Sequence, residues 1–311
     1  DVINTKRLAD KKPGTCMTCK GSQVPRLMRE VGGPAEFYKT PFDELIKRIH
    51  GEKTGIGCAD CHDSKTMELK ISRPAFKEAM KERGIDLSKA TRHQMRSYVC
   101  AQCHVEYYFK GDGKYLVFPW KNGLKIDDIE AYYDEQNFKD WVHPDSKAQI
   151  VKMQHPDFEL WSTGVHARSG VSCADCHMPY KREGGIKVSD HWVKSPLKSI
   201  NQSCQTCHRW SEDELKRWVE GVQDRTAKLM KESEIAILDA IDAIKESEAK
   251  GASEEELKEA RALHRRAHIR WDFISAENSM GFHSPQEAAR ILGEAIDFAR
   301  QAQIAAIKTN K

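Results

Sequence analysis

The stretch Cys100-Ala101-Gln102-Cys103-His104 decides the fold, because it is one of four places where a Cys-x-x-Cys pair is followed directly by histidine. In such a motif the two thiols attach a haem covalently, and the adjacent imidazole binds its iron. The other three motifs predict the same chemistry, at Cys58/Cys61 with His62, Cys173/Cys176 with His177, and Cys204/Cys207 with His208.

A fifth pair, Cys16/Cys19, is followed by Lys20 instead of histidine, and it accounts for the last of the 10 cysteines. The attachment geometry places residue 20 over the iron, and a neutral amine binds metal once burial and the metal have lowered its pKa. The alternative is that Lys20 is a surface residue and a remote histidine binds this iron. One altered motif among five predicts one haem with a catalytic rather than a relay role.

Other uses of paired cysteines fit this pattern poorly. A disulfide inside Cys-x-x-Cys closes too small a loop to hold a chain of 311 residues together, and it does not need a following histidine. Zinc sites take two pairs each, so five pairs would leave one unmatched. A thioredoxin-like redox motif does not explain five copies.

The composition agrees with an interior filled by cofactors. Only 39% of the residues are hydrophobic, whereas 31% are charged. Five haems would supply the missing apolar core. The net charge of +3 gives no indication of nucleic-acid binding. No apolar run is long enough to span a bilayer, and Asp1 starts no signal sequence, so we expect a processed or truncated chain. Because haem c is attached outside the bacterial cytoplasm, the motifs predict a periplasmic protein.

The chain has two regions within one integrated domain. Residues 1–210 carry every motif and predict short helices and long loops, whereas residues 211–311 contain no cysteine and predict long helices. Helix starts are predicted at Ser211, Ser253 and Ser284, and the first helix should run to about Lys250. Its apolar seam is predicted to pack on another helix and to favour self-association, and consists of Leu215, Trp218, Val219, Val222, Leu229, Ile235 and Leu238.

Three segments resemble the pentahaem cytochrome c nitrite reductases. They are Cys16-Met17-Thr18-Cys19-Lys20, Cys100 to Phe109, and Lys152-Met153-Gln154-His155-Pro156. The resemblance implies a mainly α fold with a haem-filled core, long loops and a C-terminal bundle of long helices. It also implies the six-electron reduction of nitrite to ammonia, with side activity on sulfite or hydroxylamine.

The resemblance places the site residues. Lys20 would be the proximal ligand of the catalytic haem, and Tyr107 and His155 would line its open side. At least one calcium ion would be held by Glu106, Tyr107, Lys152 and Gln154, which offer the oxygen ligands that calcium prefers. The pocket arginine of the family falls on Asn4 without gaps, but a shorter following loop would place Arg7 there, and we choose Arg7.

Four relay haems with two histidine ligands each need four distal histidines. The resemblance supplies His166, His191 and His283. In the family the fourth lies upstream of Asp1, so we expect that an N-terminal part is missing from this sequence, although His93, His50 or His143 are substitutes. His264 and His268 have a spacing able to bind metal on a helix, but we expect them to be exposed.

The family also implies partners. We expect a homodimer that receives electrons from a quinol-oxidising, membrane-anchored multihaem cytochrome or from a soluble multihaem donor, and that associates with the membrane through this donor. Two other classes remain. A pure electron carrier would have only six-coordinate irons, which Lys20 argues against. A hydroxylamine-oxidising enzyme would carry more haem motifs than five.

Overall fold

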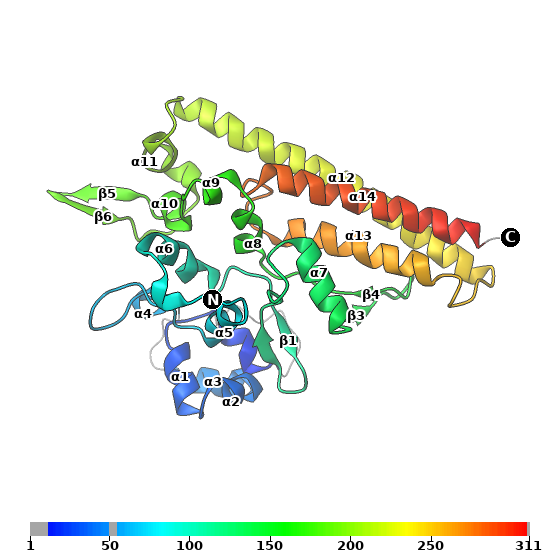
Figure 1. Ribbon diagram of the computed structural model, residues 1–311, viewed down its shortest axis with the longest axis horizontal. Helices are drawn as coiled ribbons and strands as arrows, with labels where there is room; N and C mark the ends of the chain where they lie inside the picture. The colour runs from blue at the N-terminus through cyan, green and yellow to red at the C-terminus, as the bar shows by residue number, and fades with distance from the viewer. Residues whose placement is uncertain (1–11, 50–54, 310–311) are drawn as a thin grey trace. The chain divides into compact units, whose positions relative to one another are not determined.

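The computed structural model describes residues 12–49 and 55–309, and the chain divides into two compact units, Asp1–Lys121 and Asn122–Lys311 (Figure 1). Arg7, Asn4 and His50 lie outside the described residues. Both units are mainly helical with a few short strands, which confirms the predicted fold class. The boundary does not coincide with residue 210, and the functional division at that residue stays a prediction.

Short elements joined by loops make up the first unit. Its helices are α1 (Val24–Glu30), α2 (Pro34–Lys39), α3 (Phe42–Lys47), α4 (Cys58–Cys61), α5 (Pro74–Glu82) and α6 (Arg92–Ala101), with 3-10 turns at Gly14–Met17 and Leu87–Lys89. Strands β1 (Tyr108–Lys110) and β2 (Tyr115–Val117) form an antiparallel hairpin.

Local sequence explains where these helices begin. Proline occupies the first turn of α1, α2 and α5, where its missing N–H costs nothing. Thr91 and Gln94 form a reciprocal capping box at α6. At Gly14, a Cβ atom would lie 2.1 Å from the Phe37 carbonyl oxygen, so the turn before the first cysteine pair requires glycine.

The second unit begins with elements of the same kind. Its short helices are α7 (Ile126–Glu135), α8 (Asp157–Ser162), α9 (Val165–Arg168), α10 (Cys173–His177) and α11 (Ile200–Ser203), with 3-10 turns at Pro196–Lys198 and Cys204–Thr206. Two antiparallel hairpins pair β3 (Trp141–Val142) with β4 (Gln149–Ile150) and β5 (Tyr180–Glu183) with β6 (Ile186–Ser189).

Three long helices follow, α12 (Glu212–Ala249), α13 (Lys258–Ala276) and α14 (Pro285–Lys308). Ser211 caps α12 as predicted and forms a capping box with Glu214, and α12 ends one residue before Lys250, so the prediction of the first helix is confirmed. Ser253 and Glu256 also cap each other, but they stabilise a turn, and α13 starts only at Lys258. Helix α14 begins at Pro285, directly after Ser284.

The predicted seam of α12 is partly wrong. Leu215 and Val219 are buried, but Trp218, Ile235 and Leu238 are 64%, 46% and 51% exposed. The residues that pack against α13 and α14 are instead small or β-branched, which lets the helices approach closely. They are Ala236, Ile237, Ala240, Ile241 and Ile244 on α12, Ala260 and Ala267 on α13, and Ala299, Ala302 and Ala306 on α14.

A buried arginine joins three helices of this unit. The Arg270 guanidinium on α13 is 1% exposed, and it donates to Asp127 and Glu130 of α7 at 2.7 and 2.8 Å and to Glu294 of α14 at 2.9 Å. Three carboxylates compensate one desolvated cation, so the arrangement fixes α7 against the helix pair.

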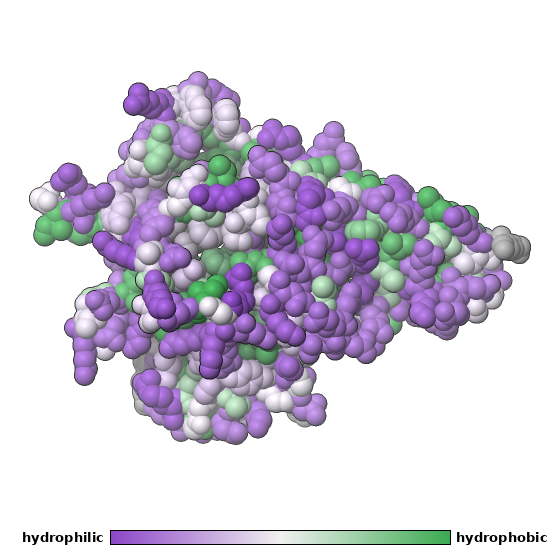
Figure 2. Space-filling view, viewed as in Figure 1, coloured by the Kyte–Doolittle hydropathy of each residue, from purple (hydrophilic) through white to green (hydrophobic). Residues whose placement is uncertain are grey.

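No helix in the described residues is long and apolar enough to cross a membrane. Figure 2 shows hydrophobic residues scattered among mostly hydrophilic ones on the visible face of the long helices.

The expectation that His264 and His268 are exposed is wrong. His264 on α13 is fully buried and His268 is partly buried, because the β3–β4 hairpin covers this face of the helix. The His264 Nδ1 atom lies 2.9 Å from the Ser146 hydroxyl, and its ring packs against His143. Burial, together with the nearby charges of His268 and His143, lowers the pKa of His264 to about 3.

We expect this histidine to make the second unit sensitive to acid. Because its folded-state pKa lies below the ordinary 6.5, its contribution to stability is complete above pH 6.5 and is lost as pH falls toward 3. Denaturant titrations should show His264 contributing a loss of about 2 kcal/mol in unfolding free energy between pH 7 and pH 5. His264→Phe should remove this part of the slope. Ser146→Ala is the control, since it removes the hydrogen bond but leaves the titrating ring and therefore the slope.

Candidate haem site

Three cysteine pairs lie in the first unit. Cys16 and Cys19 flank the end of the Gly14–Met17 turn, Cys58 and Cys61 bound α4, and Cys100 and Cys103 lie at the end of α6. All ten cysteines of the chain lie in described residues and none forms a disulfide, as the haem prediction requires. The His62 Nδ1 atom lies 2.6 Å from the Met67 carbonyl oxygen, a contact that orients the imidazole.

Two cysteine pairs lie in the second unit. Cys173 and Cys176 belong to α10, whereas Cys204 begins the Cys204–Thr206 turn and Cys207 directly follows it. Cys207 is exposed, and so is Cys58 in the first unit. At Cys207 the reason is local, because a turn of three residues offers few side chains to cover the thiol. An exposed thiol is open to the vinyl group that it would bind, and haem attachment at Cys207 stays a prediction.

A buried polar network connects the three pairs of the first unit. The Arg73 side chain is fully buried and donates to the Thr18 carbonyl at 2.7 Å, the Gly21 carbonyl at 3.1 Å and the Asp60 carboxylate at 2.6 Å. Thr18 lies inside the first Cys-x-x-Cys pair and Asp60 inside the second. Arg73 therefore fixes two attachment motifs relative to each other.

Gln102, inside the third pair, completes the network. Its Nε2 atom donates to the Asp60 carbonyl at 2.7 Å, and its Oε1 atom accepts from the backbone N–H groups of Ser72 and Arg73 at 3.0 and 3.1 Å. Asp60 also accepts from Gly57 N at 2.8 Å. The residues between the cysteines thus hold the three motifs together. These hydrogen bonds within the protein would align the predicted haem attachment sites.

Lys20 directly follows Cys19, whose thiol interacts with the Cys103 thiol of the third motif. This interaction lowers the pKa of Cys19 and raises that of Cys103, so the lysine motif lies close to a histidine motif. Lys20 is half-buried, and within residues 12–49 and 55–309 its Nζ atom has no hydrogen bond or ion pair. An amine with no carboxylate partner in this region is suited to bind a metal.

Tyr107 and Glu106 follow the third motif closely. Glu106 is fully buried. Burial raises the pKa of Tyr107 well above its ordinary value, and the charges of Cys19, Glu106 and two further cysteines raise it in the same direction. The Tyr107 hydroxyl therefore stays protonated at neutral pH and can donate a proton or hydrogen bond.

In the second unit, two pairs of imidazoles face each other. The rings of His177 and His283 have centroids 6.4 Å apart, and those of His166 and His208 have centroids 6.3 Å apart. Two imidazoles that bind one metal from opposite sides, with metal–nitrogen distances of about 2.0–2.1 Å, bring their centroids to roughly 6–6.5 Å. Each pair therefore has the spacing that a shared iron requires.

The surrounding segment also fits a large apolar group. Between residues 161 and 210, the buried apolar side chains are Ala174, Pro179 and Ile200, whereas Trp192 and Val193 are 64% and 66% exposed. A segment of this length cannot maintain its conformation on so few buried side chains. The residues around these two motifs fit covalent haem as the missing core.

The segment predicted to bind calcium is held rigidly at one end. The Lys152 Nζ atom pairs with the Asp272 carboxylate at 2.9 Å, and Met153 N donates to the same carboxylate at 2.7 Å. Gln154 Nε2 donates to the Lys152 carbonyl at 3.2 Å, so these two predicted ligands lie together. Glu106 and Tyr107 belong to the first unit, and Lys152, Gln154 and His155 to the second.

The other histidines predicted as ligands lie in different surroundings. His191 is exposed, and its Nδ1 atom lies 3.0 Å from the Ser189 carbonyl oxygen. His93 is exposed on α6. His143 belongs to the β3–β4 hairpin, where its Nδ1 accepts from the backbone N–H groups of Asp145 and Ser146. Arg7 and His50 lie outside the described residues.

Sequence reasoning missed the polar residues that support these ligands. Asp60 and Asp175 precede the second cysteine of two Cys-Ala-Asp-Cys-His motifs, and each caps the backbone before its motif. The repeated aspartate was a sequence signal that could have identified both residues. No such signal marks Arg73, Asp272 or Glu277, because each contacts residues that are distant in sequence.

Comparisons with known proteins agree with this geometry. The Cytochrome c552 family model matches residues 1–310. A Cytochrome c-552 from Parabacteroides distasonis is 50% identical over 315 residues, and one from Bacteroides thetaiotaomicron is 49% identical over 301 residues. A solved structure of cytochrome c nitrite reductase from Desulfovibrio desulfuricans, the catalytic subunit NrfA with two calcium sites, matches with a TM-score of 0.90 and 35% identity.

These matches cover nearly all of this chain but only part of the relatives. They span 99% and 96% of the chain for the two curated relatives and 97% for the solved structure. The chain spans 63% and 59% of the length of those two relatives and 68% of the solved chain.

The Arg73 network predicts a large effect on stability. Arg73→Met should lower the unfolding free energy of the haem-loaded chain by about 3–5 kcal/mol, because it leaves the Asp60 carboxylate buried without its cation. Lys70→Met is the control, since it breaks an ion pair with Asp63 that is 54% and 30% exposed and should change the unfolding free energy far less, because solvent screens exposed pairs. Equal losses in denaturant titrations of the two variants would contradict the assignment of Arg73 as the connecting residue.

Proposed function

The chain belongs to the cytochrome c552 family, and on this basis we propose that it forms the five-haem catalytic part of an ammonia-forming nitrite reductase. The observation that carries the proposal is the contrast between one lysine motif and the paired imidazoles. Irons held by two imidazoles have no open position and are suited to relay electrons. The iron over Lys20 keeps one side for substrate.

The paired rings also support an assignment of ligands. We assign His283 as the distal partner of His177 and His166 as that of His208. His62 and His104 would serve as proximal ligands in the first unit. His191 would be the distal ligand of a further haem.

The bound haem of the lysine motif would supply the open coordination position and pass on the six electrons that nitrite reduction needs. Arg7 and His155 would hold the nitrite oxygens through hydrogen bonds and positive charge, which favours N–O cleavage because the oxygen leaves as water. Tyr107 would donate a proton, and its raised pKa keeps that proton in place. Lys20 would be the protein ligand of this iron.

Calcium would complete the pocket. Glu106, the Tyr107 carbonyl, the Lys152 carbonyl and Gln154 offer four oxygen ligands, a suitable set for a hard cation. The Asp272 carboxylate would keep the Lys152 segment in its binding conformation. The ion would fix the orientation of Tyr107 and add positive charge that attracts nitrite.

The remaining assignments concern location and partners. We propose a periplasmic homodimer supplied by a multihaem electron donor, either a membrane-anchored quinol-oxidising cytochrome or a soluble protein. Sulfite is a further lone-pair oxyanion for the same iron, and hydroxylamine is a second side substrate.

Nitrite turnover tests the enzyme assignment. The haem-loaded protein, reduced with viologen and given nitrite, should oxidise the viologen and release ammonium, and the resting protein should show a high-spin haem signal. Lys20→His should keep five covalent haems but change the high-spin signal and lower ammonium formation at least about tenfold, equivalent to about 1.4 kcal/mol in barrier height. A protein with only low-spin haem and no ammonium would be an electron carrier.

Self-association is expected through α12. Ile235 and Leu238 lie three positions apart and are about half exposed, so they present an apolar surface on one helix face. The double substitution Ile235→Glu with Leu238→Glu should convert a dimer into a monomer in analytical ultracentrifugation. Lys228→Glu, on an exposed polar position of the same helix, should leave the dimer intact. A dimer that survives the double substitution uses another surface.

A further inference from the structure

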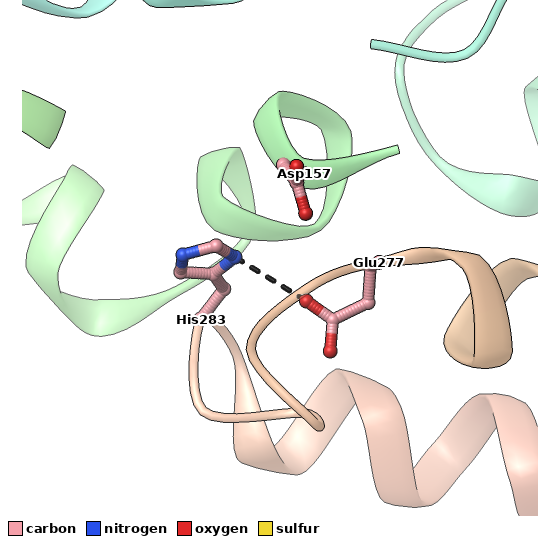
Figure 3. Close-up of side chains that lie close together, drawn as sticks. All are labelled: Asp157, Glu277 and His283. Atoms are coloured by element: carbon pink, nitrogen blue, oxygen red, sulfur yellow. Dashed lines mark ion pairs between the residues drawn. The ribbon is translucent and has the colours of Figure 1, made fainter. Parts of the chain in front are cut away.

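A carboxylate stands behind the proposed distal ligand His283. Figure 3 shows Glu277 and His283 facing each other, with Asp157 beside them. The His283 Nδ1 atom lies 3.3 Å from the Glu277 Oε2 atom. Nδ1 is buried and has no hydrogen-bond partner in the described part of the chain, so this carboxylate is the group placed to accept its proton.

The loop between α13 and α14 is folded around this carboxylate. Glu277 Oε2 accepts from Ser279 N at 2.9 Å and from the Ser279 hydroxyl at 2.7 Å, while Oε1 accepts from Gly281 N at 2.5 Å. The Ser279 hydroxyl oxygen in turn accepts from His283 N at 2.8 Å. One buried side chain therefore fixes the position of the backbone that carries the imidazole.

Asp157 ties the same loop to α8. Its two carboxylate oxygens accept from Asn278 N at 2.7 Å and from Asn278 Nδ2 at 2.9 Å. Asp157 lies two residues after His155, the proposed substrate-binding histidine. The distal ligand and the substrate histidine are thus connected through Asp157 and Asn278.

The chemistry of the imidazole gives this arrangement a consequence. When Nε2 binds iron, Nδ1 must carry the proton of the neutral ring, and a buried N–H needs an acceptor. A carboxylate acceptor withdraws that proton more strongly than a carbonyl and makes the imidazole a stronger donor to the metal. A stronger donor stabilises ferric over ferrous iron and lowers the reduction potential.

We propose that Glu277 is a positioning residue that orients His283 and lowers the potential of the haem shared by His177 and His283. This inference rests on the proposed function only for the presence of that haem. It predicts that the haems of this unit differ in reduction potential. The opposite ligand, His177, has its Nδ1 3.0 Å from the Lys194 carbonyl oxygen, and neither His166 nor His208 contacts a carboxylate in the described residues.

A metal site formed by Asp157, Glu277 and His283 is the other interpretation, since their ligand atoms lie within 4.8 Å of one another. The hydrogen bonds favour the positioning role. Both Glu277 oxygens and both Asp157 oxygens already accept protons from the 278–281 loop. An ion would have to displace these donors.

Potentiometry of the haem-loaded protein tests the proposal. The wave of the His177/His283 haem is identified as the low-spin signal that His283→Ala removes. Glu277→Gln keeps the size of the side chain but removes its charge, and should move this wave upward by at least a tenfold change in the ferric/ferrous ratio, about 59 mV for one electron. Glu287→Gln is the matched control, because it removes the same charge four residues beyond His283 and should leave the wave in place.

The outcomes separate the possibilities. Equal shifts in the two Gln variants, or none in Glu277→Gln, would overturn the role of Glu277. If Glu277→Gln loses haem in a pyridine haemochrome count, Glu277→Asp replaces it and should shift the wave in the same direction, since the shorter carboxylate withdraws from Nδ1. A chelator that moves the wave in the unaltered protein but not in Glu277→Gln would establish a metal site instead. If His283→Ala removes no low-spin signal, His283 is not a ligand and the proposal for Glu277 is overturned, whereas ammonium formation from nitrite would still support the proposed function.

Discussion

The scarcity of buried apolar side chains around the cysteine motifs of the second unit is the constraint on which the rest of the structure depends. Over residues 161–210 only Ala174, Pro179 and Ile200 are buried and apolar, too few side chains to form an interior. Covalently attached haem would meet this need, because the cofactor would become part of the chain. The short helices that carry motif residues, such as α4 and α10, would then present cysteines to a haem and not pack on another helix.

Polar networks hold the segments around the predicted ligands in position, as apolar packing does in the long helices. Arg73 and Gln102 link the three motifs of the first unit through groups inside the motifs. Glu277 and Asp157 arrange the loop that carries His283. Buried ionic groups are stabilising only when every partner is satisfied. These networks therefore fix the position of the predicted haem ligands. Their buried residues tolerate few substitutions.

The long helices follow ordinary packing rules. Their contacts rely on alanine, so the backbones of α12 and α14 approach closely enough for Ser233 and Ser247 hydroxyls to donate to carbonyls of the neighbouring helix at 3.2 and 2.9 Å. Three other large apolar residues of α12, Trp218, Ile235 and Leu238, remain on the outside. Periodicity predicted the helix correctly but not its buried face, because alanine carries little hydrophobic signal.

The sequence alone determined the attachment motifs, the exceptional Lys20 and the long helices, because each depends on residues within a few positions of one another. It did not determine which imidazoles lie close together, that His264 is buried, or that Glu277 stands behind His283. These depend on groups far apart in the chain, such as Asp157 and Asn278, separated by 121 positions. Only the tertiary structure decides them, since desolvation and hydrogen-bond geometry arise when distant segments meet.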